Sequence, residues 1–312
     1  MNNICHLIIS NTIDFSTDLV CLKLKKLGES YLRINRDKFS ECKITYKLSE
    51  NAIFITMCDE NFVIRESELK SIFFRAPVFL RSGKTYTVSE QLYRSQWSAF
   101  IRNLIVFEKS KWLNNPVDTY KAENKMYQLK LASDIGFLVP ETLLSNSANE
   151  SVVDTNEYIM KALDTALFHD GNMELFTYST IVTGLELKQS DLSSAPVIIQ
   201  EYLKEKIDIR VTVIGEKLFP VKITKNGCGI AGDWRKTSKE ALNYTPFELP
   251  KEISSKLISL MKRLNLLFGG IDLIFCNDEY YFVEVNPTGE WGWLKFATKI
   301  DLEDEIVNCM LT

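Results

Sequence analysis

The stretch YYFVEVNPTGEWGW, residues 280–293, combines an apolar strand with polar side chains at regular positions. Glu284 and Asn286 stand two residues apart, and Pro287 ends the strand. Side chains alternate between the two faces of a strand, so Glu284 and Asn286 point the same way. A carboxylate and an amide oxygen on one face are either an accident of an exposed strand or two ligands for one hard cation.

The residues just before this stretch predict the partner strand of a hairpin. If residues 277–279 form the turn, Asp272 lies opposite Glu284, and Gly270 lies opposite Asn286 without a side chain to block access. Two facing carboxylates repel each other, so the pair needs a cation or a raised pKa. Mg²⁺ suits such a pair, because it binds one or two carboxylates, an amide oxygen and substrate phosphates. The alternative is a partly exposed hairpin with solvated carboxylates.

Composition argues against several classes of protein. The chain has 312 residues and a net charge of −4, from 37 basic and 41 acidic side chains, whereas a nucleic-acid-binding protein is usually clearly basic. No apolar run approaches the roughly 18 residues that span a bilayer, and the N-terminus lacks the basic region of a signal peptide. The seven cysteines form no CxxC pair, which favours reduced thiols and a cytoplasmic location. Two histidines are too few for a His-rich zinc site.

The N-terminal part predicts a strand–helix–strand unit. Residues 4–10 read as a buried strand, residues 16–28 as a helix that ends at Gly28, and residues 30–35 as a second strand. A unit of this length usually forms a right-handed parallel crossover. Residues 41–69 then alternate like antiparallel strands with polar turns.

The remainder of the chain mixes helices and strands, so the predicted fold class is α/β, in the broad sense that includes α+β. A mobile loop with short strands is expected over residues 168–186, which hold Gly171, Gly184 and many small polar residues. Further strands are predicted at 71–80, 141–145 and 156–163, three within 195–224 and two within 271–286, and further helices at 89–111, 120–136, 250–269 and near the C-terminus.

Two lysines are candidate ligands for an anion. Lys161 stands inside the apolar run YIMKAL, where a buried amine costs free energy unless it meets an anion. The alternative is a lysine on an edge strand whose amine reaches water. Lys125 lies in a predicted helix, where an exposed lysine is common.

Three other polar features are ambiguous by themselves. The segment QEYL, residues 200–203, ends a buried strand; its main-chain groups could read the edge of a purine, or the chain simply leaves the sheet there. Asp208 and Arg210 share a face of the next strand, so Arg210 either binds phosphate or carboxylate or forms a surface ion pair. Arg235 lies in a loop, within the sequence DWR.

The order of these features resembles that of an ATP-grasp ligase. A lysine on a helix, a lysine on a strand, a loop of small residues, QEYL, DIR and then Asp…Glu-x-Asn on a hairpin follow one another between residues 112 and 295. The N-terminal strand–helix–strand unit is similar to the domain that usually precedes them. The segments WLNNP, GFLVPET, DWR and EVNPTGEWGWL look more narrowly like graspetide synthetases, the peptide-modifying branch that includes microviridin-type ligases and grasp-with-spasm maturases.

The resemblance implies an ATP-grasp fold in three parts. These are a pre-ATP-grasp-like domain over residues 1–115, a central lobe with the mobile loop over 116–200, and a C-terminal lobe with the metal site over 201–312; the two lobes clasp the nucleotide. The loop has fewer glycines than a strongly phosphate-cradling loop, and Asp208 stands where a glutamate is common. The implied roles are phosphate contact for Lys125 and Lys161, the adenine pocket for Gln200, Glu201, Tyr202 and Leu203, the ribose for Asp208, Mg²⁺ for Asp272, Glu284 and Asn286, and the γ-phosphate and acceptor carboxylate for Arg210 and Arg235.

The activity that the resemblance implies is ATP-dependent ligation within a ribosomally made precursor peptide, which has a leader and a core rich in acidic and hydroxyl side chains. Asp or Glu carboxylates become acyl phosphates and are joined to Ser or Thr hydroxyls or to Lys amines, giving macrocyclic esters or amides, ADP and phosphate. The implied cofactors are ATP and Mg²⁺, and the family suggests a homodimer. Two alternatives stay open: a ligase that adds free amino acids to a peptide or protein, as ribosomal-protein glutamate ligases do, and a nucleotide-binding module without turnover.

Overall fold

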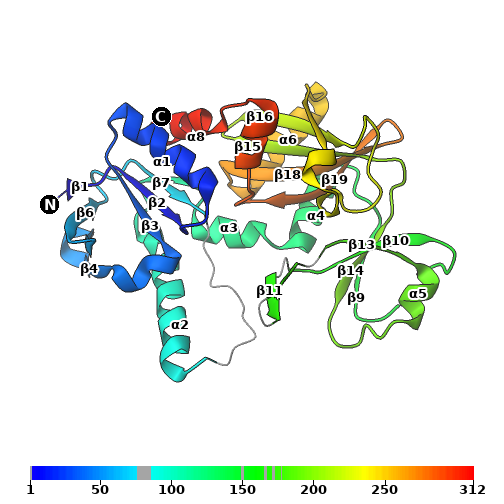
Figure 1. Cartoon of the computed structure of the whole chain (residues 1–312), viewed down its shortest axis with the longest axis horizontal. Helices are drawn as coiled ribbons and strands as arrows, with labels where there is room; N and C mark the ends of the chain where they lie inside the picture. Colours follow the sequence, from blue (N-terminus) through cyan, green and yellow to red (C-terminus); the bar gives the residue numbers. More distant parts are fainter. Residues whose placement is uncertain (1, 76–85, 149–150, 165–166, 171–172, 177) are drawn as a thin grey trace.

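The protein is a mixed α/β structure, as predicted (Figure 1). Two four-stranded sheets lie in its N-terminal part, a five-stranded sheet lies in the middle of the molecule, and a further four-stranded sheet lies at the opposite end. Among the described residues, no helix is long and apolar enough to cross a membrane. The computed structural model describes residues 2–75, 86–148, 151–164, 167–170, 173–176 and 178–312.

The N-terminal part contains the predicted strand–helix–strand unit. β2 (His6–Ser10) and β3 (Tyr31–Asn35) are parallel, and α1 (Phe15–Leu27) connects them. Gly28 ends α1 at a φ of 74°, in the left-handed region that glycine adopts without strain. The complete sheet is parallel in the order β3-β2-β7-β8, in which β7 is Ser71–Phe74 and β8 is Lys111–Leu113.

A second N-terminal sheet is antiparallel, as predicted for residues 41–69. β4 (Lys43–Lys47), β5 (Ala52–Met57) and β6 (Glu60–Arg65) pair in the order of the sequence. β1 (Asn2–Asn3) joins the free edge of β6 in the parallel direction. The apolar residues between this sheet and β2, β3 and β7 form one buried core.

Two predicted elements of the N-terminal part end earlier than expected. α2 (Val88–Asn103) stops well before residue 111, because a 3₁₀ turn follows it and residue 111 already belongs to β8. The strand predicted over 71–80 is β7 as far as Phe74, and its residues from 76 onward lie outside the described residues.

The helix predicted over residues 120–136 is instead two helices, α3 (Pro116–Ala122) and α4 (Lys125–Ile135). Asn124 separates them, and its side-chain amide donates hydrogen bonds of 2.9 and 3.1 Å to two carbonyls in the last turn of α3. Such local bonds compete with the continuing helix. Lys125 therefore begins α4 and does not lie in the middle of a helix.

The five-stranded sheet is antiparallel in the order β17-β16-β15-β18-β19. α4 and α6 (Lys251–Leu264) pack on one of its faces around a continuous apolar core, and the other face is turned toward the pocket described below. α6 ends at Leu264, with Asn265 as its C-cap, and not at 269, because the next strand begins at 268. The strands are β15 (Ile207–Ile214), β16 (Lys217–Thr224), β17 (Asn243–Pro246), β18 (Phe268–Cys276) and β19 (Glu279–Asn286).

The β18–β19 hairpin reaches the predicted pairing by an unexpected route. Its turn contains two residues, Asn277 and Asp278, both with positive φ, and not the three that were predicted. A bulge after Asp272 adds one residue to β19 and offsets the shorter turn. Asp272 therefore lies opposite Glu284, as predicted, and the pairing of the last residues of β19 is also the predicted one.

The far sheet has the order β13-β10-β14-β9. The segment predicted as a loop with short strands is more regular than expected, because β13 is followed directly by a helix, α5 (Gly184–Gln189). A hairpin of β11 (Leu167–Asp170) and β12 (Met173–Phe176) precedes it, and Gly171 lies outside the described residues. The four strands of the sheet are β9 (Thr142–Ser145), β10 (Glu157–Lys161), β13 (Thr180–Thr183) and β14 (Val197–Glu201).

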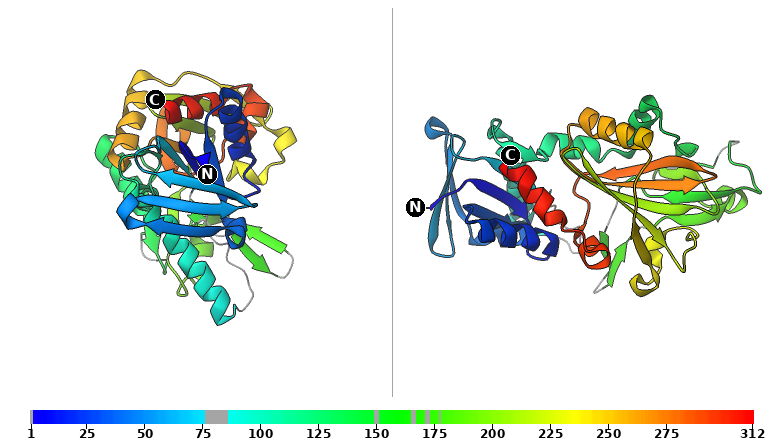
Figure 2. Two further views of the ribbon diagram at one scale, coloured as in Figure 1. Left: turned by 90° about the vertical axis from the view of Figure 1, so that its left-hand side faces the viewer. Right: turned by 90° about the horizontal axis from the view of Figure 1, so that it is seen from above.

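The C-terminal helices return to the N-terminal part of the molecule. α7 (Gly292–Thr298) and α8 (Leu302–Leu311) lie beside α1, far from the sheet that contains β9 (Figure 2). Apolar residues of α1, β7, β15 and α8 share one buried cluster. The three domains predicted from the sequence, 1–115, 116–200 and 201–312, stay a proposal, and any such division must accommodate this return of the chain.

Candidate active site

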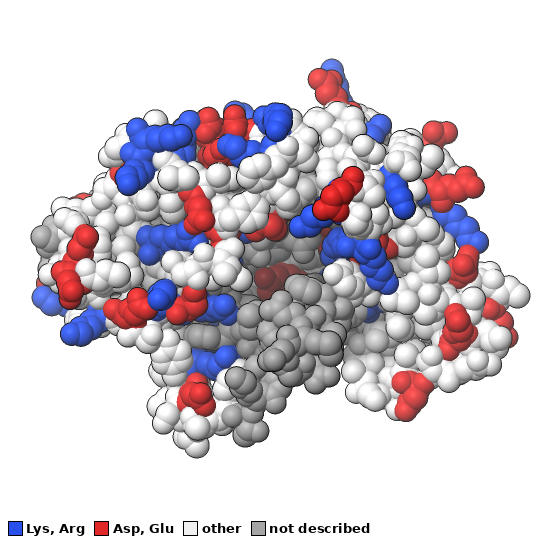
Figure 3. Space-filling model, in the orientation of Figure 1, with Lys and Arg blue, Asp and Glu red and all other residues white. Residues whose placement is uncertain are grey.

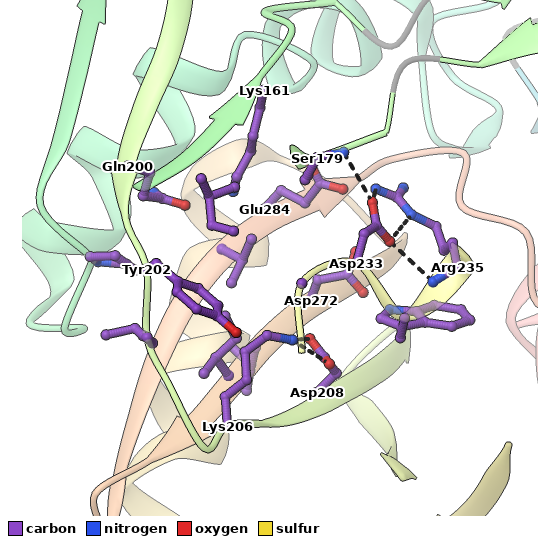
Figure 4. Close-up of a pocket in the computed structure, with 18 of the residues that line it drawn as sticks. Lys161, Ser179, Gln200, Tyr202, Lys206, Asp208, Asp233, Arg235, Asp272 and Glu284 are labelled. Carbon is purple, nitrogen blue, oxygen red and sulfur yellow. Dashed lines mark hydrogen bonds and ion pairs between the residues drawn. The ribbon is translucent and has the colours of Figure 1, made fainter. Parts of the chain in front are cut away.

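A pocket lies between the four-stranded sheet of β10 and β14 and the open face of the five-stranded sheet (Figure 4). In the space-filling view the molecule is hollowed at its centre, and both acidic and basic side chains surround the hollow (Figure 3). Ten of the residues predicted from the sequence line this pocket: Lys125, Lys161, Gln200, Glu201, Tyr202, Leu203, Asp208, Arg235, Asp272 and Glu284.

The two other predicted residues are bonded to carboxylates of this pocket. Arg210 donates from a terminal guanidinium nitrogen to Oδ1 of Asp272 at 2.8 Å. The amide of Asn286 donates to Oε1 of Glu284 at 3.2 Å. All twelve predicted residues therefore lie in one region, although they come from eight different elements and loops.

The facing carboxylates of Asp272 and Glu284 have different electrostatic surroundings. Burial raises the pKa of Asp272, and the nearby Glu284 raises it further against the opposing charge of Arg210. Burial also acts to raise the pKa of Glu284, but the charges of Lys125, Lys161 and Arg235 outweigh it and lower that pKa. Two such groups titrate as a pair, and the first proton that the pair takes up binds to Asp272 rather than to Glu284.

Lys125 of α4 and Lys161 of β10 lie close to the carboxylates of the pocket. Nζ of Lys125 lies 3.6 Å from Oε2 of Glu284 and donates to the carbonyl of Ala162 at 3.2 Å, so this lysine is not an ordinary exposed helical residue. Lys161 lines the pocket, and burial together with neighbouring cations lowers its pKa to about 8, against the opposing charge of Glu284. β10 lies between β13 and β14, so Lys161 is not on an edge strand. Its position agrees with the interpretation that Lys161 binds an anion.

Arg210 occupies the space next to Gly270, which corrects one prediction. A Cβ on Gly270 would lie 2.9 Å from the central guanidinium carbon of Arg210. The missing side chain therefore makes room for this arginine and does not open access to Asn286. A surface ion pair of Arg210 with Asp208 is also absent among the described contacts, because Asp208 is bonded to Lys206 (2.6 Å).

Arg235 is held by its own loop. Its guanidinium donates two hydrogen bonds to the carboxylate of Asp233, at 2.9 and 2.7 Å, and this pairing raises the pKa of Arg235 above its already high value. The ring of Trp293 lies 5.8 Å from that of Trp234 and 5.0 Å from that of Tyr244. The tryptophan-rich segment after Asn286 thus supports the loop that carries Arg235.

The strand exit at residues 200–203 is fixed from the sheet side. The amide of Gln200 donates to Oγ1 of Thr142 at 2.8 Å, and the main-chain N–H of Glu201 donates to the carbonyl of Glu141 at 2.8 Å. The Glu201 N–H is therefore used inside the sheet. Tyr202 and Leu203 follow the end of β14 and line the pocket.

Two contributors were missed by sequence reasoning. Lys206 is buried and donates to both oxygens of Asp208, and the alternation of the strand, which places residues 206 and 208 on one face, could have indicated it. Gln128 is also buried, and its amide bonds the N–H (2.9 Å) and the carbonyl (2.8 Å) of Val285. It thereby completes the outer edge of β19 between Glu284 and Asn286, a long-range contact without a local signal.

The donor set agrees with a metal–polyanion complex. The described residues contain no group of three or more His, Cys, Asp and Glu side chains that could hold a metal ion, and the predicted set has two carboxylates and one amide instead. Four cationic side chains, of Lys125, Lys161, Arg210 and Arg235, lie around the two carboxylates of Asp272 and Glu284. The cationic side chains close to these two carboxylates fit the phosphates of a ligand, and the facing carboxylates fit Mg²⁺. The pocket lining also contains the acidic residues Asp164, Glu201, Asp208 and Asp233.

Comparisons with known proteins identify the fold. Residues 180–310 match the family model described as the RimK-like ATP-grasp domain. A RiPP-associated ATP-grasp ligase of Chryseobacterium gregarium, in complex with ADP and a leader and core peptide, superposes with a TM-score of 0.85 at 24% identity, over 100% of this chain and 97% of that chain. The chain has the ATP-grasp fold. The ATP-grasp fold expected from the order of its motifs is thus confirmed.

Other proteins similar to this chain are named for different ligation reactions. The macrocyclase MdnC of Microcystis aeruginosa, bound with its precursor peptide MdnA, gives a TM-score of 0.81 at 25% identity, over 98% of this chain and 99% of that chain. The tetrahydromethanopterin:alpha-L-glutamate ligase of Methanocaldococcus jannaschii is 24% identical over 68% of this chain and 75% of its own length. The glutathione synthetase of Synechococcus elongatus is 27% identical over 74% and 69%, respectively.

Proposed function

We propose that this protein is an ATP-dependent peptide ligase that activates Asp or Glu side-chain carboxylates of a precursor peptide and joins them to Ser or Thr hydroxyls or Lys amines of the same peptide. The observation that carries the proposal is the pocket itself, in which Lys125, Lys161 and Arg235 lie around the facing carboxylates of Asp272 and Glu284, while Arg210 is bonded to Asp272. Support also comes from ligases solved in complex with peptides, which have the same fold over nearly the whole chain.

The proposed roles come from the family resemblance, and the charge and place of the side chains are compatible with them. Asp272, Glu284 and Asn286 hold Mg²⁺ on β18 and β19, while Lys125 and Lys161 bind the phosphates from the opposite side. Mg²⁺, when bound there, would neutralise phosphate charge. Arg210 and Arg235 bind the γ-phosphate and the acceptor carboxylate. Gln200, Glu201, Tyr202 and Leu203 line the adenine pocket, and Asp208 contacts the ribose.

The reaction requires no nucleophile from this chain. A peptide carboxylate attacks the γ-phosphorus of ATP, which releases ADP and gives an acyl phosphate. A hydroxyl or amine of the peptide then attacks the acyl carbon, and phosphate leaves with formation of an ester or amide. The side chains of the pocket bind, orient and neutralise charge, which agrees with a site rich in cations.

A second candidate is a ligase that adds free amino acids to a peptide or protein. It is favoured by the glutamate ligases among the relatives and by the RimK-like family model. We infer the peptide-cyclising activity first, because the peptide-bound ligase structures align over 98% or more of this chain. A homodimer, a cytoplasmic location and docking of the peptide's leader near the central lobe are further parts of the proposal.

The test combines intact peptide mass with ADP release. Purified protein is incubated with Mg-ATP and a short peptide, rich in Thr, Ser, Lys, Asp and Glu, that is encoded beside its gene. Loss of one water for each ADP released supports intramolecular ester or amide formation. A mass gain after addition of free amino acids supports the second candidate. Absence of both products, together with absence of Mg-ATP binding in a calorimeter, would contradict both ligase proposals.

A further inference from the structure

The turn after β19 connects the proposed metal site with the N-terminal part of the molecule. It comprises residues 287–290, begins directly after Asn286 and leads into α7. Its outer side lies against the N-terminal part, because Arg75, which follows β7, donates a hydrogen bond of 3.3 Å to the carbonyl of Gly289. The guanidinium also pairs with the carboxylate of Glu290 at 3.5 Å.

Arg75 is a buried charge that the proposed reaction does not use. Its side chain is only 6% exposed, and its guanidinium lies 5.6 Å from the ring centres of both Phe73 and Phe268. Its Nε donates to Oδ2 of Asp14 at 3.1 Å, and Asp14 in turn accepts from Ser10. A buried ion pair of this kind contributes little net stability but fixes geometry.

The contacts of Arg75 continue to the proposed metal ligands. The N–H of Gly289 donates to the main-chain carbonyl of Asn286 at 3.1 Å, and the Asn286 amide donates to Glu284 at 3.2 Å. Gly289 is packed closely against the strands, because a Cβ on it would lie 3.3 Å from both the Asn286 oxygen and the Gly270 Cα. A displacement of the turn therefore displaces Asn286.

The other end of the turn is held by Asn114, from the WLNNP segment. Its amide nitrogen donates to the carbonyls of Phe268 and Pro287, at 2.8 and 3.0 Å, and its oxygen accepts from two main-chain N–H groups at the start of β18. Asn114 thus joins β18 to the first residue of the turn. Arg75 holds the last two residues, so the turn is fixed from both ends.

We propose that Arg75 is a positioning residue, which holds the turn at residues 287–290 so that Asn286 faces the metal between Asp272 and Glu284. This inference rests on the proposed function of Asn286 as a metal ligand. An arginine is needed because its planar fork reaches Asp14, Gly289 and Glu290 together, whereas a lysine has one ammonium group.

The test measures metal binding and not turnover. In the full-length protein saturated with ADP, Mn²⁺ is titrated and free Mn²⁺ is followed by electron paramagnetic resonance. We expect Arg75→Lys to weaken Mn²⁺ binding roughly 10-fold, the scale on which outer contacts affect metal affinity. Metal-free ADP binding, measured by calorimetry, should stay within about twofold of the unaltered protein, because Arg75 is not among the residues that line the pocket.

Arg33→Lys is the matched control. Arg33 is another poorly exposed arginine of the N-terminal part, with a side chain that is 14% exposed and pairs with Asp18, and its described contacts do not include the turn. This variant should bind Mn²⁺ as the unaltered protein does. If Arg75→Lys does not fold, Glu290→Gln replaces it, because the new amide would keep an oxygen for the N–H groups of Trp291 and Gly292 but lose the charge that pairs with Arg75.

Three outcomes decide the matter. Weakened Mn²⁺ binding in Arg75→Lys or Glu290→Gln, with Arg33→Lys unchanged, supports the inference. Equal Mn²⁺ affinity in all variants overturns it while leaving the ligase proposal intact. If the unaltered protein binds ADP but its Mn²⁺ affinity is the same after Asn286→Ala, the metal role of Asn286 fails and the inference fails with it.

Discussion

The two sheets that face the pocket differ in how firmly they hold their functional side chains. β15, β18 and β19 have eight or nine residues each and pack on α4 and α6, whereas β10 and β14 have five residues each. The smaller sheet rests on a modest described core around Val152, Leu187 and Ile199. The facing carboxylates of Asp272 and Glu284 therefore lie on the larger sheet, whose core holds them in place against their mutual repulsion. Lys161 lies on the smaller sheet.

The largest effect is expected when a carboxylate is removed from the larger sheet. Asp272→Asn or Glu284→Gln should reduce ADP formation by at least about 10²–10³-fold, because each removes a charged ligand at the reacting phosphates. ADP release and thermal unfolding are measured together. Asp278→Asn, in the exposed turn of the same hairpin, is the matched control and should keep full activity. Full activity in Asp272→Asn or in Glu284→Gln would contradict the assignment of these residues as metal ligands.

A second test separates the two faces of β18. Gly270→Ala should displace Arg210 from Asp272, since the new Cβ would lie 2.9 Å from the guanidinium carbon, and we expect activity to fall roughly 10-fold or more. Gly269→Ala is the control on the opposite face, where the Cβ meets Met261 at 3.2 Å. It should cost about 1–3 kcal/mol of unfolding free energy through overpacking and retain turnover. Equal activity loss in both variants would contradict the role given to Arg210.

The third test concerns the smaller sheet and pH. Burial lowers the pKa of Lys161 to about 8, so the amine is charged below that pH and loses its charge above it. ADP affinity, measured by calorimetry between pH 7.5 and 9.5, should therefore fall as pH rises through 8, by at most roughly tenfold per pH unit. Lys161→Met should bind ADP weakly at every pH and flatten the profile. A profile that keeps the same slope in Lys161→Met would assign the titration to another group.

The smallest effect is expected at the aromatic support of the Arg235 loop. Trp293→Leu removes the ring contacts to Trp234 and Tyr244, which are worth about 0.5–1.5 kcal/mol, and should weaken ADP binding only a few-fold. Trp97→Leu removes a comparable stack on Phe39 in the N-terminal part and should lower the unfolding temperature without changing ADP affinity. A larger loss of ADP affinity in Trp97→Leu than in Trp293→Leu would contradict this assignment.

The hairpin shows why parts of the site could be predicted. Strand alternation placed Glu284 and Asn286 on one face, and that property depends only on the local backbone. The position of Asp272 opposite Glu284 depends also on the register of the hairpin. The predicted turn was one residue too long, and the bulge after Asp272 restored the register by adding one residue to β19. Buried apolar strands and the glycine at the end of α1 were equally local and were confirmed.

The missed features depend on packing between distant segments. Spacing indicated that Arg210 shares a face with Asp208, but its partner, Asp272, comes from a strand that pairs beside it only in the folded sheet. The bonds of Gln128 to Val285 join residues that lie 157 positions apart. A local pattern tells which way a side chain points along its own element, and only the fold decides what it meets.

The packing of α8 against α1 has a consequence for the order in which the chain folds during synthesis. Val20 and Leu24 of α1 are buried in one cluster with Ile306 and Met310 of α8, which is translated only after both pocket-forming sheets. The part of the apolar side of α1 that packs on α8 stays uncovered until residue 310 has left the ribosome, although Ile8 and Phe73 of the N-terminal sheet cover another part earlier. A nascent chain that stalls before that point therefore exposes this side to chaperones and to other chains.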